Sequence, residues 1–296
     1  MPETGPIPFP RVHLFCQYKT TRVFFTAKLL LFFFLFLTFC SPLYGSETGG
    51  SGSYLAAGIG VEQLTYKEQI PDLGLASSET DLLNWVLYLE AQKAWKNFFM
   101  GAKGRVPLSA DEAREYWSRG GNLEQSNSLT YRWARADAHL GYFLHPLLKP
   151  YIGIHWAYSE QERSDFLIVG IPGIIAETAT EEVYALSSLL GIQGGLPFAA
   201  GWSLSYSAEY MLPFYSNITN SRLPGWEASN INGYSYALAG RLHYAISETV
   251  SATLQATGGR QHWEGSDWVR IGSSNAKWPE NDTDFISFSV SILKSF

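Results

Sequence analysis

The chain has 296 residues, of which 46% are hydrophobic and 16% charged, and its formal net charge is −6. This length is sufficient for one or two domains with a buried core, and the excess of acidic side chains argues against a nucleic-acid-binding protein. Beyond residue 45 no run of eighteen apolar residues occurs, so the sequence predicts no membrane-spanning helix in the main body of the chain.

The first 45 residues have the pattern of a secretory signal peptide. An apolar block at 29–40 follows Arg22 and Lys28, and a basic flank before a short apolar core is typical of export signals. The block would span only about 18 Å, against about 30 Å of membrane hydrocarbon, which argues against a permanent anchor. We expect cleavage after Gly45, with Leu43 at the minus-three position.

Two further features of this leader affect its interpretation. A lipoprotein would use Cys40, but the residue before it, Phe39, is not small. The region before the apolar block is unusually long for a bacterial signal, and we hypothesise that translation starts near Val23. Both cysteines, Cys16 and Cys40, lie in the leader, so the exported chain would contain no disulfide. Four basic residues and one acidic residue leave with the leader, which makes the net charge of the remainder −9.

After a Gly/Ser-rich stretch at 46–53, which we expect to be a flexible lead-in, apolar residues recur at every second position. This spacing is typical of β-strands, and it fits helices poorly because residues two apart lie on different helix faces. The predicted strands are 54–66, 82–92, 98–106, 129–144, 150–160, 181–194, 202–214, 233–246, 249–258 and 285–296. Their lengths are close to what a tilted strand needs to cross a bilayer.

Short and long connections alternate between these strands. Short turns are predicted at 93–97, 145–149, 196–200 and 247–248, and long polar loops at 67–81, 107–128, 161–180, 215–232 and 263–284. Such alternation is typical of up-and-down barrels whose two rims face different compartments. The sequence therefore predicts one all-β domain over 54–296, a transmembrane antiparallel up-and-down β-barrel of ten strands, with eight or twelve strands as alternatives.

The two faces of the predicted strands indicate the surrounding solvent. A soluble sandwich buries its apolar face, whereas a membrane barrel turns that face to lipid and fills its interior with small polar residues. Here the apolar rows carry aromatic residues near their ends, such as Trp156, Tyr158 and Trp202, as interfacial belts do. The opposite rows are mostly Ser, Gly, Ala and Thr rather than Lys and Glu. Both observations favour the membrane barrel.

The charged residues on the polar rows are balanced in sign. Unpaired charges inside a narrow barrel would cost several kcal/mol each, so we expect an interior network of ion pairs and hydrogen bonds. Its predicted members are Glu62, Glu90, Lys103, Arg105, Arg135, Asp137, His139, His155, Glu209, Arg241 and His243.

In the last predicted strand Phe288, Val290, Ile292 and Phe296 stand at alternate or terminal positions, and this pattern resembles the last strand of Gram-negative outer-membrane β-barrel proteins. Such barrels commonly end in an aromatic residue after alternating apolar residues, which the outer-membrane assembly machinery recognises. Lys294 departs from the aromatic residue usual at its position. The resemblance covers 54–296 and implies a location in the cell outer membrane, with membrane lipid, lipopolysaccharide and the assembly machinery as partners.

Within this class the sequence resembles no particular family. Ten strands enclose an interior that side chains can fill, which argues against an open, porin-like pore. The predicted function is therefore a structural or surface-interaction role, in which long extracellular loops engage a partner outside the cell. The alternatives are a narrow channel or transporter of hydrophobic ligands, and an omptin-like surface protease or another outer-membrane enzyme.

The sequence offers few residues for an enzyme. Omptin-type proteases resemble this chain in length and layout and rely on acidic and His–Asp pairs at the extracellular rim. The predicted loops contain Asp111, Glu112, His262 and Asp267, without a matching motif. A lipid hydrolase would need Ser, His and an acid at the outer leaflet on the lipid face, but His243 has the interior parity, and both His243 and Ser247 lie near a short turn on the periplasmic side. No catalytic residue is assigned.

No metal or cofactor is expected either, since the histidines lack metal-ligand spacing and the acids lack a calcium-loop pattern. One predicted loop is unexpectedly apolar, at 166–175. Either this stretch packs on neighbouring loops or folds into the barrel mouth, or it is a hydrophobic patch for a ligand, a partner or outer-leaflet lipid.

Overall fold

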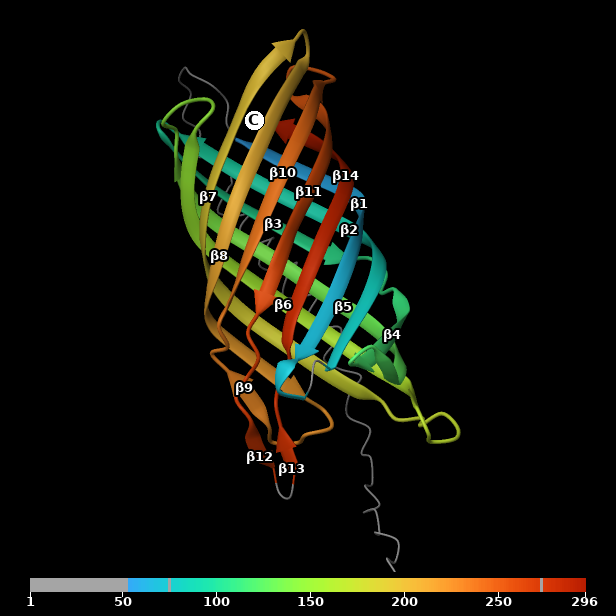
Figure 1. The fold of residues 1–296 in the computed structure, drawn as a ribbon. Helices are drawn as coiled ribbons and strands as arrows, with labels where there is room; N and C mark the ends of the chain where they lie inside the picture. The colour runs from blue at the N-terminus through green and yellow to red at the C-terminus, as the bar shows by residue number, and fades with distance from the viewer. Residues whose placement is uncertain (1–52, 74–75, 272–273) are drawn as a thin grey trace, which may run out of the picture. The chain divides into compact units, whose positions relative to one another are not determined.

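The computed structural model describes residues 53–73, 76–271 and 274–296 (Figure 1). The predicted signal peptide, its cleavage site and nearly all of the predicted lead-in lie outside the described residues. No helix among those described is long and apolar enough to cross a membrane.

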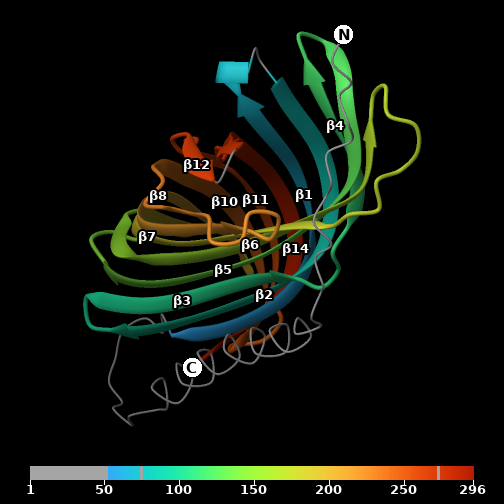
Figure 2. The same cartoon turned by 90° about the horizontal axis from the view of Figure 1, so that it is seen from below.

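In the described part of the chain, antiparallel strands close into a barrel around a common lumen (Figure 2). The barrel strands are β1 (Tyr54–Ile70), β2 (Ala76–Trp95), β3 (Phe98–Pro107), β4 (Glu112–Arg119), β5 (Asn122–Tyr142), β6 (Lys149–Ile168), β7 (Ala179–Ala199), β8 (Trp202–Asn220), β10 (Gly233–Ala245), β11 (Val250–Trp263) and β14 (Glu280–Ser295). β3 and β4 both pair with β2 and β5, so together they fill one of the ten strand positions. β1 pairs with β14 and with β2, which closes the sheet without a free edge.

Three short strands and one 3-10 turn lie in the connections. β9 (Glu227–Ser229) pairs with β8, while β12 (Val269–Ile271) and β13 (Ser274–Ala276) pair with each other in the loop before β14. The 3-10 turn η1 (Pro71–Leu73) follows β1. These elements gather at one end of the barrel, opposite the end that carries the chain terminus marked in Figure 1.

We call the two ends the short-turn end and the long-loop end. The short-turn end has the turns at 96–97, 200–201 and 246–249, and there the amide of Phe296 donates a hydrogen bond to the carbonyl of Ser53. Both ends of the described chain therefore lie at the short-turn end, as an even strand number requires. The long-loop end has the connections at 169–178 and 264–279.

The stagger of the strands follows from their register. A row of paired residues runs from Asp81 on β2 through Thr65 on β1 and Asp284 on β14, and continues around the barrel. The row returns to β2 at Lys93, twelve residues from its start. Such a stagger tilts the strands by about 40° from the barrel axis and leaves a lumen that side chains can fill.

Exposed apolar side chains form a belt on the outer wall next to the short-turn end. Its members include Ile59, Leu83, Trp85, Leu140, Ile152, Ile154, Leu190, Ile192, Leu204, Leu212, Leu238, Leu254, Ile286, Phe288, Val290 and Ile292. Aromatic pairs lie at its two edges, with ring centroids 4.8 Å apart for Trp202 and Tyr244 and 6.1 Å apart for Trp156 and Tyr184. A belt of this kind faces the hydrocarbon of a bilayer, and the aromatic rings face its interfaces.

Beyond the belt the strands continue toward the long-loop end, and here several sequence predictions were wrong. At least half of each of the predicted loops 67–81, 161–180 and 215–232 is strand, so the connections are shorter than expected. The outward residues of these extensions are polar, for example Lys67, which lies 3.2 Å from Glu79. Because both faces then carry polar residues, the alternation that identifies a strand fades, although the hydrogen-bonded ladder continues.

The predicted long loop 107–128 was also wrong, since it contains β4 and a two-residue turn. Gly120 and Gly121 form that turn with φ of +56° and +83°, which favours glycine. Between β3 and β4, side chains replace part of the backbone ladder. Asp111 Oδ2 accepts a hydrogen bond from the amide of Leu83 at 2.9 Å, and Ser109 Oγ accepts one from the amide of Trp85 at 3.3 Å.

Buried apolar side chains occupy the lumen at three levels. Nearest the short-turn end, Phe99 packs with Tyr151, Leu189 and Met211. A second cluster includes Leu64, Tyr66, Leu82, Val86, Leu129, Tyr131 and Trp133. The third, at the long-loop end, includes Trp226, Trp263 and Trp278. Side chains therefore fill much of the interior between the polar groups described below.

Candidate functional site

The interior polar groups lie on the face of each strand opposite the lipid belt. Nearest the short-turn end, Arg241 on β10 reaches Glu90 on β2, with NH2 to Oε2 at 3.0 Å and NH1 to Oε1 at 3.3 Å. On the shorter path around the barrel these strands are separated by β1, β14 and β11, so the pair crosses the lumen. Arg241 also donates to Tyr88 Oη at 3.1 Å and to Gln255 Oε1 at 2.9 Å, and Tyr54 donates to Glu90. We call this arrangement the Arg241 bridge.

A second bridge is centred on Lys103. Its ammonium group, on β3, contacts Glu209 on β8 and lies 3.4 Å from Asp137 Oδ2 on β5. The ring of His155 contacts Asp137, and the hydroxyl of Tyr151 donates to Glu209 Oε1 at 2.5 Å. Since β3 and β8 are separated by three strands, this Lys103 bridge also spans the lumen.

Four of the remaining predicted residues have other surroundings. Arg105 lies 3.5 Å from Glu62, which is fully buried. The guanidinium group of Arg135 lies between the rings of Trp133 and Phe285, 4.7 Å from each centroid. The ring of His139 lies beside Tyr151, with centroids 4.7 Å apart.

The eleventh predicted residue, His243, joins neither bridge. Its Nε2 lies 2.7 Å from Ser205 Oγ, and its Nδ1 lies 2.8 Å from Thr253 Oγ1. Sequence analysis paired this histidine with Ser247, but Ser247 Oγ accepts the amide of Val250 within the turn, at 3.2 Å. Ser205 lies 38 positions before His243 on a neighbouring strand, so the spacing along the chain could not identify the pair.

A third cluster, which sequence analysis missed, lies beyond the lipid belt toward the long-loop end. Arg163 on β6 donates through Nε to Glu115 Oε2 at 2.7 Å, and its NH2 lies 2.8 Å from Glu68 Oε1 on β1. Glu181 accepts a hydrogen bond from Trp278 Nε1 at 2.7 Å. We call these four ionisable residues the Arg163 cluster; the carboxyl groups of Glu68 and Glu115 are almost wholly shielded from solvent.

The Arg163 cluster holds three carboxyl groups around one guanidinium group, which gives them different proton affinities. Burial, together with the charges of Glu115 and Glu181, raises the pKa of Glu68 to about 7 despite Arg163. Burial also acts on Glu115, but the charge and hydrogen bonds of Arg163, with hydrogen bonds from Asn127 and Ser78, outweigh it and lower the pKa of Glu115. Most of these residues fall in stretches predicted to be loops. The signal that could have found Glu68 is its parity, which continues the inward row of Glu62 and Leu64.

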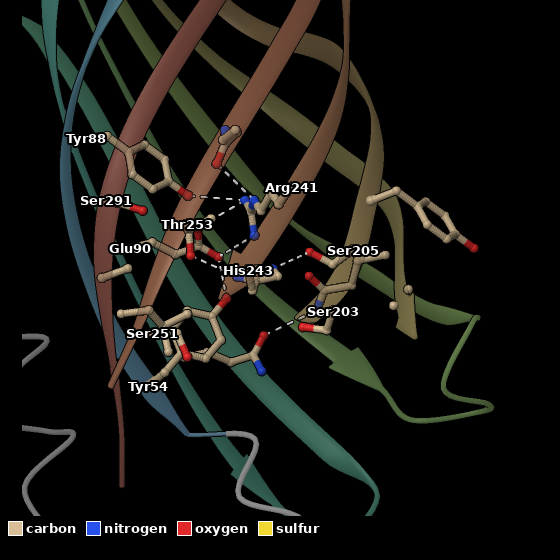
Figure 3. A pocket seen from close by; sticks show the side chains of 18 of the residues that line it. Tyr54, Tyr88, Glu90, Ser203, Ser205, Arg241, His243, Ser251, Thr253 and Ser291 are labelled. Atoms are coloured by element: carbon tan, nitrogen blue, oxygen red, sulfur yellow. Dashed lines mark hydrogen bonds and ion pairs between the residues drawn. The ribbon is translucent and has the colours of Figure 1, made fainter. Parts of the chain in front are cut away.

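A cavity of about 270 Å³ lies inside the short-turn end, and we call it the vestibule. Hydroxyl and amide side chains form much of its wall, among them Tyr54, Gln193, Ser203, Ser205, Ser251 and Thr253. Figure 3 shows Glu90 from β2, and Arg241 and His243 from β10, pointing into this space. A cavity of about 40 Å³ lies beside the Lys103 bridge. The vestibule is therefore the larger of these two interior spaces.

The candidate rim residues do not form a site together. Glu112 begins β4 and Asp111 precedes it, whereas His262 lies on β11, and β2, β1 and β14 separate these positions. Asp111 completes the strand ladder, and the ring of His262 pairs with Asp282 Oδ1 at 2.9 Å on the outward side. Asp267 lies in the loop before β12. Over the described ranges, no group of three His, Cys, Asp or Glu residues could hold a metal ion.

The apolar stretch 166–175, which we call the apolar rim loop, lies at the long-loop end. Its base is fixed by backbone hydrogen bonds between Phe166 and Ile175, at 2.9 and 3.2 Å. Its tip is open to solvent, with relative exposures of 63% for Val169, 51% for Ile171 and 60% for Ile174. The loop therefore neither fills the barrel mouth nor buries these side chains on its neighbours.

Comparison with known proteins shows the fold. No protein-family model and no curated protein sequence matches the chain. Among solved structures, the outer membrane protease OmpT from Escherichia coli is similar, with a TM-score of 0.60 and 9% identity over 85% of this chain and 99% of that one. The translocator domain of autotransporter NalP from Neisseria meningitidis matches with a TM-score of 0.38 and 12% identity, over 93% and 98% of the two chains. The ten-stranded barrel prediction is confirmed, and the eight- and twelve-stranded alternatives are excluded.

Proposed function

We propose that this chain is an outer-membrane protein, a closed surface barrel whose long-loop rim binds a partner outside the cell; the proposal is supported by a fold similar to that of an outer membrane protease. In such barrels the short turns face the periplasm and the longer connections face the exterior. The observation that carries the proposal is the apolar rim loop, where Val169, Ile171 and Ile174 are all more than half exposed. Single exposed apolar residues are ordinary, but a contiguous group of them is typical of an interaction surface.

The interior supports a closed barrel rather than a channel. The Arg241 bridge and the Lys103 bridge each cross the lumen, and the Arg163 cluster crosses it again from β6 to β1. Opening a path would require these buried charges to separate, and a charge left buried without its partner is costly. The buried tryptophans at the long-loop end add to the obstruction.

The rim residues give no support to a protease. Similarity to OmpT at 9% identity concerns the fold alone. Asp111 is engaged in the strand ladder, and His262 lies four strands away. The predicted rim residues of the described chain therefore do not form the acidic and His–Asp pairs that such a protease uses. Binding at the rim is therefore the function that the geometry supports best.

The proposal can be tested by making the rim loop polar. Cells would display the wild-type chain or the triple variant Val169→Ser, Ile171→Ser and Ile174→Ser at matched surface amounts, and adhesion to alkyl-coated beads would be counted. Leu123→Ser is the control, since Leu123 is 49% exposed near a different connection. We expect adhesion to fall for the triple variant and to stay unchanged for the control. Equal adhesion of all three strains would refute rim binding through this loop.

A further inference from the structure

The vestibule contains a chain of hydrogen bonds that neither a closed barrel nor a binding rim requires. It runs across three neighbouring strands, from Ser205 on β8 through His243 on β10 to Thr253 on β11. All three side chains line the vestibule (Figure 3), so the serine hydroxyl is beside open space rather than sealed in the interior.

The geometry of these hydrogen bonds from Ser205 to Thr253 matches that of an activated serine. A neutral imidazole donates from one nitrogen and accepts at the other. With the proton on Nδ1, His243 donates to Thr253 Oγ1 at 2.8 Å, and its Nε2 accepts the hydroxyl proton of Ser205 at 2.7 Å. A nucleophile, a base within hydrogen-bond reach and a third group that orients the base are the features that define nucleophilic serine sites. Thr253 is directly opposite His243 in the ladder, so its position is fixed by strand pairing.

Two cations lie around the same space. Arg241 is the direct ladder partner of Ser205 on the adjacent strand, and its charge is paired with Glu90, so Lys149 supplies the uncommitted positive charge. Lys149 also lines the vestibule, and the contact given for its ammonium group is the ring of Phe143, at 5.4 Å. The ion pairs within the described ranges do not include Lys149, so its charge is open to an anionic ligand. Positive charge near the reacting carbonyl stabilises the oxyanion that forms during acyl transfer.

The surrounding sheet limits what such a site could hydrolyse. Backbone amides next to Ser205 are committed to the ladders with β7 and β10, so a backbone oxyanion hole of the usual kind is not formed there. Side-chain cations alone stabilise the oxyanion less, which favours esters over the more stable amides. The hydroxyl- and amide-rich wall and the charge of Lys149 favour a polar acyl group that carries a carboxylate.

We propose that Ser205 and His243 form a second, catalytic site that hydrolyses small anionic carboxylic esters from the periplasmic side, with Thr253 as the positioning residue. Ser205 Oγ bonds to the ester carbonyl carbon as its proton passes to His243 Nε2. The tetrahedral adduct then collapses, the bond to the alcohol oxygen breaks, and the alcohol leaves with that proton. Water attacks the acyl-serine in the same manner and gives its proton to Nε2, which releases the acid and returns the proton to Ser205.

The experiment uses the full barrel folded into lipid nanodiscs, with mono-4-nitrophenyl succinate as the substrate and a biotinylated fluorophosphonate as the active-site probe. We expect ester hydrolysis and a single labelled peptide that contains Ser205. Ser205→Ala and His243→Gln should each lower the rate by about 100-fold or more. Ser207→Ala, which removes a hydroxyl of β8 outside the lining of the vestibule, should leave it unchanged.

Variants at Thr253 distinguish a role in orienting His243 from a role in packing alone. Thr253→Val keeps the shape but removes the oxygen that accepts from Nδ1, so hydrolysis should fall, and Thr253→Ser should restore it. Heat-dependent migration on a denaturing gel verifies that each variant is folded. Hydrolysis by the wild type no faster than by Ser205→Ala, or labelling spread equally over Ser203, Ser205 and Ser251, would overturn the proposal. Adhesion through the apolar rim loop depends on other residues, so the result of the adhesion experiment is independent of the result of the hydrolysis experiment.

Discussion

Replacing Arg163 by methionine should destabilise the barrel strongly, because two buried carboxyl groups lose the same cation. Arg163 lies 2.7 Å from Glu115 and 2.8 Å from Glu68, whose side chains are 0% and 1% exposed. Removing one member of a buried ion pair costs about 3 to 5 kcal/mol, since the remaining charge stays buried without compensation. We therefore expect the free energy of unfolding at pH 8 to fall by about that amount.

The matched control is Arg132→Met on the neighbouring strand β5. Arg132 also faces two carboxylates, Glu160 and Glu162, but it lies on the outer wall and its side chain is 33% exposed. Exposed pairs of this kind contribute at most about 1 kcal/mol. The assay is urea unfolding of the barrel in phospholipid vesicles, followed by tryptophan fluorescence. If the two variants lose the same stability, the Arg163 cluster is not the buried centre described above, and the reasoning fails.

Three further predictions concern the interior and the loop at Gly121. The raised pKa of Glu68 means that the folded state keeps a proton that the unfolded state releases between pH 4.5 and about 7; stability from this group is therefore highest below pH 4.5 and falls as the pH rises. Compared with Glu68→Gln, the wild type should lose up to about 3 kcal/mol of its free energy of unfolding between pH 4.5 and about 7, as measured by urea titrations at several pH values. Parallel plots of this free energy against pH for the two proteins would contradict the prediction. Lys103→Met should lower the urea midpoint of unfolding more than Lys67→Met does. Lys103 pairs with the buried Glu209, whereas Lys67 pairs with the exposed Glu79. Gly121→Val should slow refolding or lower stability by about 1 to 2 kcal/mol because its φ is +83°, and an unchanged urea midpoint would exclude that strain.

The spacing of apolar residues predicted the barrel because the residues that face lipid are apolar and lie at every second position of each strand. Within the belt, Phe288, Val290 and Ile292 alternate with serines, and the structure places all three on the outer wall. The same reasoning predicted interior positions for Glu90, Asp137 and Arg241; in the structure Glu90 and Arg241 pair with each other, and Asp137 lies beside Lys103. The parity of a strand is thus readable from sequence wherever one of its faces is apolar.

Sequence alone could not show which residues of neighbouring strands lie opposite each other, or which side chains meet across the lumen. Ser205 and His243 are neighbours only because β8 and β10 pair in one particular register, which depends on the loop between them. The Arg163 cluster combines residues from β1, β4, β6 and β7 in a region where both strand faces carry polar residues, so the period-two pattern is weak there and only Glu68 continues an inward row that the sequence shows. The same loss of contrast caused strand extensions to be predicted as loops.

Recording from planar lipid bilayers determines whether the buried bridges that cross the lumen close it to ions. Purified barrel, with folding verified by its heat-dependent migration on a gel, would be inserted into the bilayer at physiological salt and neutral pH. We predict no stepwise conductance in the wild type, because the Arg241 and Lys103 bridges occupy the lumen. Stable, ohmic conductance steps from the folded wild-type barrel would contradict the account.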